Sequence, residues 1–102
     1  MADVKDIIKQ QIAENQVVLY MKGSPKFPMC GFSARAAKLL SLCGVSEYMS
    51  VNVLEDEAIR QSIKEVSNWP TVPQLYVKGE FIGGSDIMAD MYEAGELQRL
   101  FS

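Results

Sequence analysis

One cysteine, Cys30, stands between a loop with two prolines and a run that predicts an amphipathic helix, in the segment KGSPKFPMCGFSARAAKLL at residues 22–40. At a helix N-terminus, unpaired backbone N–H groups and the positive end of the helix dipole favour a thiolate over a thiol. Lys22 places a second positive charge across the loop. We therefore expect Cys30 to have a pKa below the usual value of about 8.5, as a nucleophile or a metal ligand requires.

Two other roles for Cys30 are a buried apolar filler and half of a redox pair. Gly31 argues against a filler, because a glycine beside the sulfur lets another molecule approach closely. A C-x-x-C pair would need a second thiol at the position of Ser33. Cys43 continues an apolar helical stripe and is expected to be a core residue, about 20 Å from Cys30 if both lie on one helix, whereas a disulfide needs roughly 4.4–6.8 Å between Cα atoms. The pattern predicts a site with one thiol.

Composition limits the other chemistry that is open to the chain. The 102 residues, 48% hydrophobic and 23% charged, predict one small globular domain, residues 1–102. The absence of histidine excludes Ser-His and Cys-His nucleophilic pairs and histidine-ligated metals. The net charge of -3 and the scattered Lys and Arg residues disfavour a nucleic-acid partner.

The chain also lacks the patterns of a membrane or secreted protein. No apolar run approaches the roughly 20 residues that span a bilayer, and MADVKDIIKQ lacks the apolar core of a secretory signal. We expect a cytoplasmic protein without a membrane partner.

Apolar periodicity divides the chain into short helices and strands. Helical spacing predicts five helices, namely one that Asp3 opens, one that follows Cys30 and stops at Gly44, one at residues 55–68, and two after Ser85. Strands are expected at residues 17–21, 48–53, 74–77 and 80–83, with Lys78-Gly79 as a hairpin turn. The order α-β-α-β-α-β-β-α-α, with a leading parallel βαβ unit and a closing hairpin, predicts a thioredoxin-like α/β fold: a small four-stranded mixed sheet flanked by helices.

Four motifs in this order and spacing resemble those of the monothiol, CGFS-type glutaredoxins, and the similarity covers nearly the whole chain. They are K-G-S-P at residues 22–25, C-G-F-S at 30–33, W-P-T-V-P-Q at 69–74 and G-G-S-D at 83–86. One departure is Ser85, where many members of the family carry a cysteine. Any role of that second thiol is not available here.

The resemblance implies glutathione binding and a [2Fe-2S] cluster held between two subunits, for cluster assembly or transfer and iron homeostasis. Members of the family resemble iron-sulfur carriers more than efficient reductases. Expected partners are a second copy of the chain when the cluster is bound, BolA-type proteins and recipient apo-proteins.

The resemblance also assigns glutathione-binding residues, and the chemistry suits a tripeptide with two carboxylates and one ammonium. Lys22 and Arg60 resemble the residues that hold the glycine carboxylate, since a guanidinium fork suits a carboxylate. The alternative for Arg60 is a solvated position on a polar helix face.

The T-V-P segment, Thr71 to Pro73, resembles the part of the site where the family has a cis proline. The Val72 backbone would then pair with the glutathione cysteine like an added strand. The alternatives are an ordinary strand-initiating Pro73, and loop packing rather than a pocket wall for Trp69-Pro70.

The G-G-S-D segment would complete the pocket. Free N–H groups at Gly84, Ser85 and Asp86 suit the γ-glutamyl carboxylate, while Asp86 can bind the α-ammonium. The alternative is a helix cap, and both roles can hold at once.

Thiol counting favours the cluster role. A [2Fe-2S] unit takes four ligands, and Cys30 is the one thiol expected at the surface, so two chains and two glutathiones would complete the set. The main alternative is a glutathione-dependent thiol-disulfide oxidoreductase that acts through a Cys30-glutathione mixed disulfide. A third is an adaptor that uses the scaffold only to bind a partner.

Overall fold

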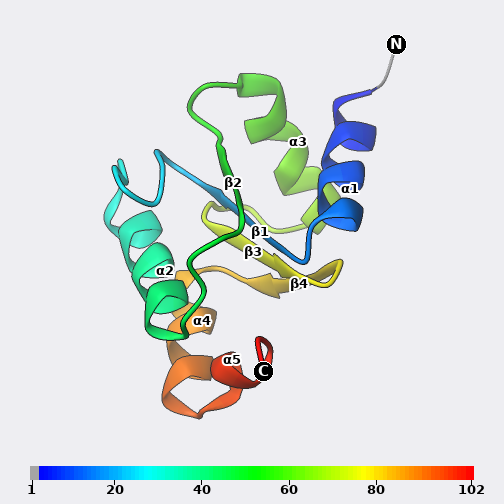
Figure 1. Ribbon diagram of the computed structural model, residues 1–102. Coiled ribbons are helices and arrows are strands. Elements are labelled where there is room, and N and C mark those ends of the chain that lie inside the picture. The colour runs from blue at the N-terminus through cyan, green and yellow to red at the C-terminus, as the bar shows by residue number, and fades with distance from the viewer. Residues whose placement is uncertain (1–2) are drawn as a thin grey trace.

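A four-stranded mixed sheet forms the middle layer of the protein (Figure 1). The computed structural model describes residues 3–102, and the helices and strands follow one another in the predicted order. They are α1 (Val4–Glu14), β1 (Val17–Met21), α2 (Gly31–Leu42), β2 (Met49–Asn52), α3 (Glu57–Ser67), β3 (Gln74–Val77), β4 (Glu80–Gly83), α4 (Ser85–Glu93) and α5 (Glu96–Arg99). The predicted fold is confirmed.

The sheet has the strand order β2-β1-β3-β4. β1 and β2 are parallel, as expected for a βαβ unit whose crossover is α2, while β3 runs antiparallel to β1 and β4 antiparallel to β3. Lys78 and Gly79 join β3 to β4 with φ values of 52° and 82°, the positive φ that a tight hairpin turn requires at both central residues. β1 therefore lies in the middle of the sheet, and its carboxyl end leads into the loop that precedes Cys30.

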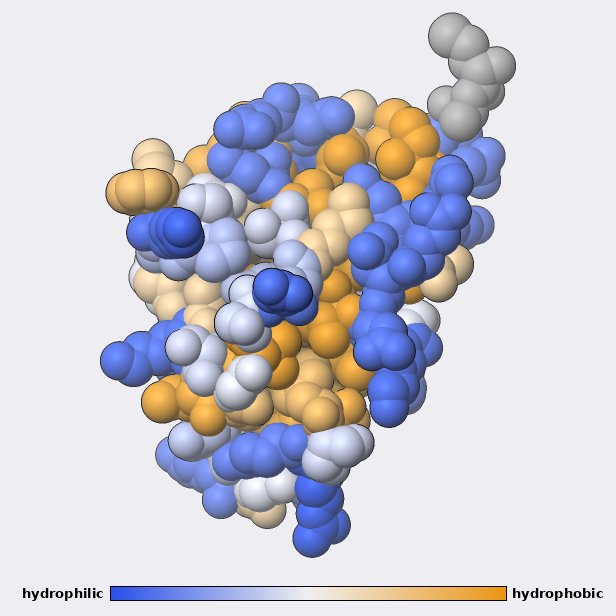
Figure 2. All heavy atoms as spheres, in the orientation of Figure 1, coloured by the Kyte–Doolittle hydropathy of each residue, from blue (hydrophilic) through white to orange (hydrophobic). Residues whose placement is uncertain are grey.

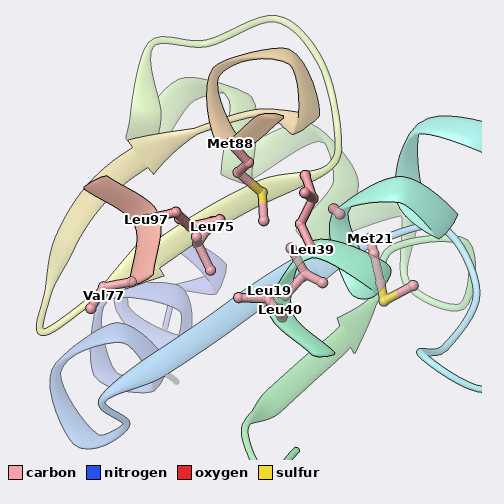
Figure 3. Close-up of a cluster of buried hydrophobic side chains, with 9 residues drawn as sticks. Leu19, Met21, Leu39, Leu40, Leu75, Val77, Met88 and Leu97 are labelled. Atoms are coloured by element: carbon pink, nitrogen blue, oxygen red, sulfur yellow. The ribbon is translucent and has the colours of Figure 1, made fainter. Parts of the chain in front are cut away.

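Each face of the sheet is covered by its own helices (Figure 1). Val18 and Tyr20 of β1 pack with α1 and α3, while Leu19 and Met21 pack with α2, α4 and α5. This alternation follows from the period of two along a strand. Figure 3 shows the second of these clusters, where Leu19, Leu75 and Met88 meet. The continuous apolar run of β1 is thus explained by burial on both faces.

The ends of α2 set the positions of both cysteines. Cys30 is the N-cap, and the helix ends at Leu42 with Cys43 as the C-cap. Gly44 adopts a φ of 80°, and the Gly44 and Val45 N–H groups bond back to the carbonyls of Ser41 and Leu40, which closes the helix. Cys43 is therefore half-buried at a helix end, rather than fully inside the core as its place in the stripe suggested.

Two aspartates begin helices as N-caps. The Asp3 side chain accepts a hydrogen bond from the Lys5 N–H at 3.2 Å, and the Asp56 side chain accepts one from the Ile59 N–H at 3.1 Å. Among residues 3–102, no helix has the length and apolar character needed to cross a bilayer.

Candidate functional site

A pocket of about 500 Å³ lies where helices from both layers approach the loops at one end of the sheet. The residues predicted for the site all line it, namely Lys22, Cys30, Arg60, Thr71, Val72, Gly84, Ser85 and Asp86. The lining also includes Phe32, Lys64, Trp69, Pro70, Pro73 and Ile87. Three segments far apart in the sequence thus form one surface around the thiol.

The Cys30 thiol is half-exposed at the N-terminus of α2. It makes no capping hydrogen bond there, but the backbone N–H of Ser33 is the main group that lowers the pKa of Cys30. Burial opposes this as the second-largest effect, and the Phe32 N–H, the Ser33 hydroxyl and the Lys22 ammonium each lower the pKa by a smaller amount. A Cβ added at Gly31, the next residue in the chain, would meet nothing within 4 Å, so the space at that position is open.

Ser33 connects α2 to the end of β1. It is fully buried, and its Oγ accepts a hydrogen bond from the Lys22 N–H at 3.0 Å. The position that would hold a second thiol in a C-x-x-C protein therefore holds a hydroxyl that supports both Lys22 and the Cys30 thiolate.

The loop between β1 and Cys30 is held by its own backbone. The Met29 N–H bonds to the Lys22 carbonyl at 2.9 Å, and the Gly23 N–H bonds to Oδ1 of Asn52 at 3.0 Å. Gly23 has a φ of 87°, and a Cβ there would lie 2.4 Å from the Phe27 carbonyl oxygen. Only glycine fits this position, and the loop places Cys30 at the pocket.

Lys22, Arg60 and Lys64 bring three cations to the pocket. Arg60 has one carboxylate near it, Glu57 at 4.0 Å, and neither lysine forms an ion pair with any residue in 3–102. Sequence reasoning missed Lys64. Its spacing of four residues from Arg60, which places both on one face of α3, was the signal that could have found it.

Three backbone N–H groups at the pocket have no protein acceptor. Within residues 3–102, the N–H groups of Val72, Ser85 and Asp86 donate no hydrogen bond. The Val72-Pro73 peptide bond is cis, as the resemblance of the T-V-P segment implied. Polar groups of this kind need a partner such as water or a ligand.

Trp69 lines the pocket and also packs in the fold, so both roles considered for it hold. Its ring lies 5.8 Å from that of Phe81, centre to centre, and its Nε1 would be 3.6 Å from a Cβ added at Gly84. Gly84 is the N-cap of α4 and Ser85 its first residue, so no side chain caps this helix. A side-chain cap at Ser85 or Asp86 is therefore not formed.

Asp86 is the acidic residue of the pocket lining among the described residues. Its carboxylate forms an ion pair with Arg35 of α2. The pocket thus offers cations from Lys22 and α3, and free N–H groups and a carboxylate from α4, with the thiol on α2. Such a site suits a small anionic thiol or disulfide that also carries a positive charge.

Exposed apolar residues lie on both sides of Cys30 in the chain. Phe27, Met29 and Phe32 are 74%, 68% and 60% exposed, and Figure 2 shows hydrophobic residues at the tip of the loop before α2. The helical spacing of Phe32 with Ala36, Leu39 and Leu40 predicts that it packs in the core, and this prediction is wrong. Phe32 lies in the first turn, beside Cys30, and lines the pocket instead of packing on the sheet.

Comparison with known proteins gives matches over most of the chain. The model of the Glutaredoxin family matches residues 17–82. Glutaredoxin 4 of Escherichia coli K12 is 53% identical over 93 residues, which are 91% of this chain and 80% of that protein. The mitochondrial monothiol glutaredoxin-5 of Schizosaccharomyces pombe is 48% identical over 98 residues, 94% of this chain and 67% of its own length.

A solved structure has the same fold at similar identity. Reduced apo GrxS14 from poplar superposes with a TM-score of 0.81 and 45% identity, over 96% of this chain and 89% of that one. The similarity of sequence and the similarity of structure agree.

Proposed function

The chain belongs to the monothiol, CGFS-type glutaredoxins, and from this premise we propose that it binds glutathione in the pocket and, as a pair of chains, carries a [2Fe-2S] cluster for assembly and transfer. The observation that carries the proposal is a single thiol with a lowered pKa, half-exposed at a pocket that also holds cations and free N–H groups. The cluster is the cargo of this protein.

The charges of the pocket support glutathione as the small ligand. Its glycine carboxylate matches Lys22 and Arg60, with Lys64 nearby. Its γ-glutamyl carboxylate matches the N–H groups of Ser85 and Asp86 at the start of α4, and its cysteine can pair with the Val72 backbone. The Asp86 carboxylate can bind the α-ammonium.

The donor set supports a cluster shared between chains. Cys30 is the thiol at the pocket, and within residues 3–102 no group of three or more His, Cys, Asp and Glu side chains could hold a metal ion. A [2Fe-2S] cluster takes four ligands, mostly thiolates. Two Cys30 thiolates and two glutathione thiolates would supply them, and because glutathione exchanges, the cluster would be labile enough to transfer.

The partners and the compartment follow from the same proposal. A second copy would be recruited with the cluster, and BolA-type proteins and recipient apo-proteins would bind at the exposed thiol side. The cytoplasm is the proposed compartment, since it supplies glutathione and keeps thiols reduced.

Anaerobic reconstitution with iron, sulfide and glutathione tests the proposal, with gel filtration followed by absorbance. We expect a coloured dimer, or a multiple of it, with two iron atoms and two glutathiones per pair of chains. Cys30→Ser should abolish colour and dimerisation together. Cys43→Ser is the matched control and should keep both.

Two results would contradict the cluster role: a stable cluster without any small thiol, or a loaded monomer without another thiol donor. If neither iron nor glutathione changed the protein in any measurement, it would be an adaptor. Removal of glutathione from the loaded protein should bleach it unless another small thiol is added.

The lowered pKa of Cys30 also favours a second activity, thiol-disulfide exchange with glutathione. The Cys30 thiolate would attack the glutathionyl sulfur of a glutathionylated protein and release that protein's thiolate. A second glutathione thiolate would then attack the mixed disulfide, which frees Cys30 and forms glutathione disulfide. Fast turnover with a glutathionylated substrate, without stable cluster binding, would make this the main function.

A further inference from the structure

An ion pair at the edge of the pocket has no role in the proposal so far. Arg35 of α2 donates from Nη2 to Oδ1 of Asp86, in the first turn of α4. Asp86 lines the pocket, whereas Arg35 does not. The side chains are 45% and 82% exposed. The carboxylate proposed to bind the ligand's ammonium is therefore already in contact with a protein cation.

We propose that Arg35 is a specificity-determining residue, which weakens the preference of this pocket for ligands that carry a free α-ammonium group. The inference rests on the proposed function, in which Asp86 binds the ammonium of the γ-glutamyl group. That ammonium must either displace the guanidinium or bind the second oxygen, Oδ2, beside it. In both cases two cations share one carboxylate, and affinity falls because like charges repel.

The rest of the pocket offers the ammonium no substitute. Among the described residues, the other charged groups of the lining are cations, Lys22, Arg60 and Lys64. Arg35, likewise, has no other ion pair within residues 3–102. Competition at Asp86 therefore acts on one part of the ligand, the ammonium, and leaves its two carboxylates on their own partners.

Arg35→Gln tests the inference, because it removes the charge and keeps a polar side chain. The apo protein is titrated by NMR with reduced glutathione and with glutathione acetylated on its α-amine, at low ionic strength. The affinity for glutathione should rise about two- to five-fold, the effect expected of an exposed ion pair. The affinity for the acetylated compound should not rise, so the ratio of the two affinities increases.

Arg99→Gln is the matched control. It makes the same change of charge on an exposed residue of α5 that does not line the pocket, and it should leave the ratio unchanged. In an Asp86→Asn background, Arg35→Gln should have no further effect on the ratio, because the shared carboxylate is gone.

An unchanged or smaller ratio in Arg35→Gln would overturn the inference while glutathione binding itself still supports the proposed function. Persistence of the Arg35→Gln effect in the Asp86→Asn background would also overturn it. If the native protein and the variant both failed to bind glutathione, the proposed function would fall first, and this inference with it.

Discussion

At the residue scale, the two thiols of this chain stand in opposite electrostatic environments. The Ser33 and Phe32 N–H groups stabilise a negative charge on Cys30 and lower its pKa, whereas burial raises the pKa of Cys43. A thiol whose pKa is lower in the folded than in the unfolded chain stabilises the fold at pH above the unfolded value, and this contribution is lost as the pH falls through the folded value. Cys43, whose pKa is raised, stabilises the fold at pH below the unfolded value, and this contribution is lost as the pH rises through the folded value.

We expect Cys30 to be alkylated first in the native apo protein. The alkylation rate of Cys30 should reach half of its maximum at a lower pH than the rate of the same thiol in the urea-unfolded chain. The alkylation rate of Cys43 should reach half of its maximum at a higher pH. Iodoacetamide labelling across a pH series, read by mass spectrometry of peptides, measures this. Equal rates at both cysteines would contradict the assignment of Cys30.

Lys64 supplies a second residue-scale prediction, since it lines the pocket beside Arg60 and has no ion pair among the described residues. Lys64→Gln should weaken glutathione binding about two- to five-fold without a change in the melting temperature, because the lost interaction is a partly solvated charge pair. Calorimetric or NMR titration measures the affinity. Lys38→Gln, on an exposed residue outside the pocket, should leave it unchanged.

At the scale of elements, the loop before α2 depends on one glycine. Gly23→Ala places a Cβ 2.4 Å from the Phe27 carbonyl oxygen and 2.7 Å from the Met29 nitrogen, at a φ of 87°. Gly44→Ala has a similar φ of 80° but meets nothing within 4 Å. Gly44→Ala should lower the free energy of unfolding by about 1–2 kcal/mol, and Gly23→Ala by clearly more.

Urea unfolding measures the free energy of unfolding of both variants. The difference between their two losses reports the steric clash at residue 23, because both variants carry the cost of an alanine at positive φ. Equal losses would mean that the loop relaxes around the new methyl group. In that case Cys30 would not depend on the loop for its position.

The order of elements was predictable because each one carries a local signal, such as the continuous apolar run of β1 or the Lys-Gly pair at residues 78–79 between two strand patterns. Motif spacing also indicated which residues line the pocket. The half-buried place of Cys43 and the exposure of Phe32 depend on where α2 starts and ends over the sheet. The contact of Arg35 with Asp86 joins residues 51 positions apart, and no local pattern contains it.

At the scale of the whole molecule, the charges of the surface and of the pocket differ in sign. The chain carries a formal charge of -3, while the described pocket lining has three cations and one carboxylate. Added salt should therefore weaken glutathione binding and strengthen the pairing of two loaded chains, because salt at 0.1 M largely screens exposed charges that lie more than about 10 Å apart. Titration and sedimentation at 20 and roughly 300 mM salt, about a four-fold change in Debye length, measure the two trends. If added salt changed glutathione binding and the pairing of chains in the same direction, this account would be wrong.

The pocket takes its lining from both sides of the sheet, with Arg60 and Lys64 on α3 and Cys30 at the N-cap of α2. These helices belong to separate apolar clusters, so either layer can open locally without breaking the packing of the other. A ligand that contacts both layers couples them, so that the two layers open together. Glutathione at 100 times its dissociation constant should add about 2.7 kcal/mol to the global unfolding free energy. Amide hydrogen exchange should then slow in α3 and α2 together, whereas slowing in one helix alone would place the ligand on that layer only.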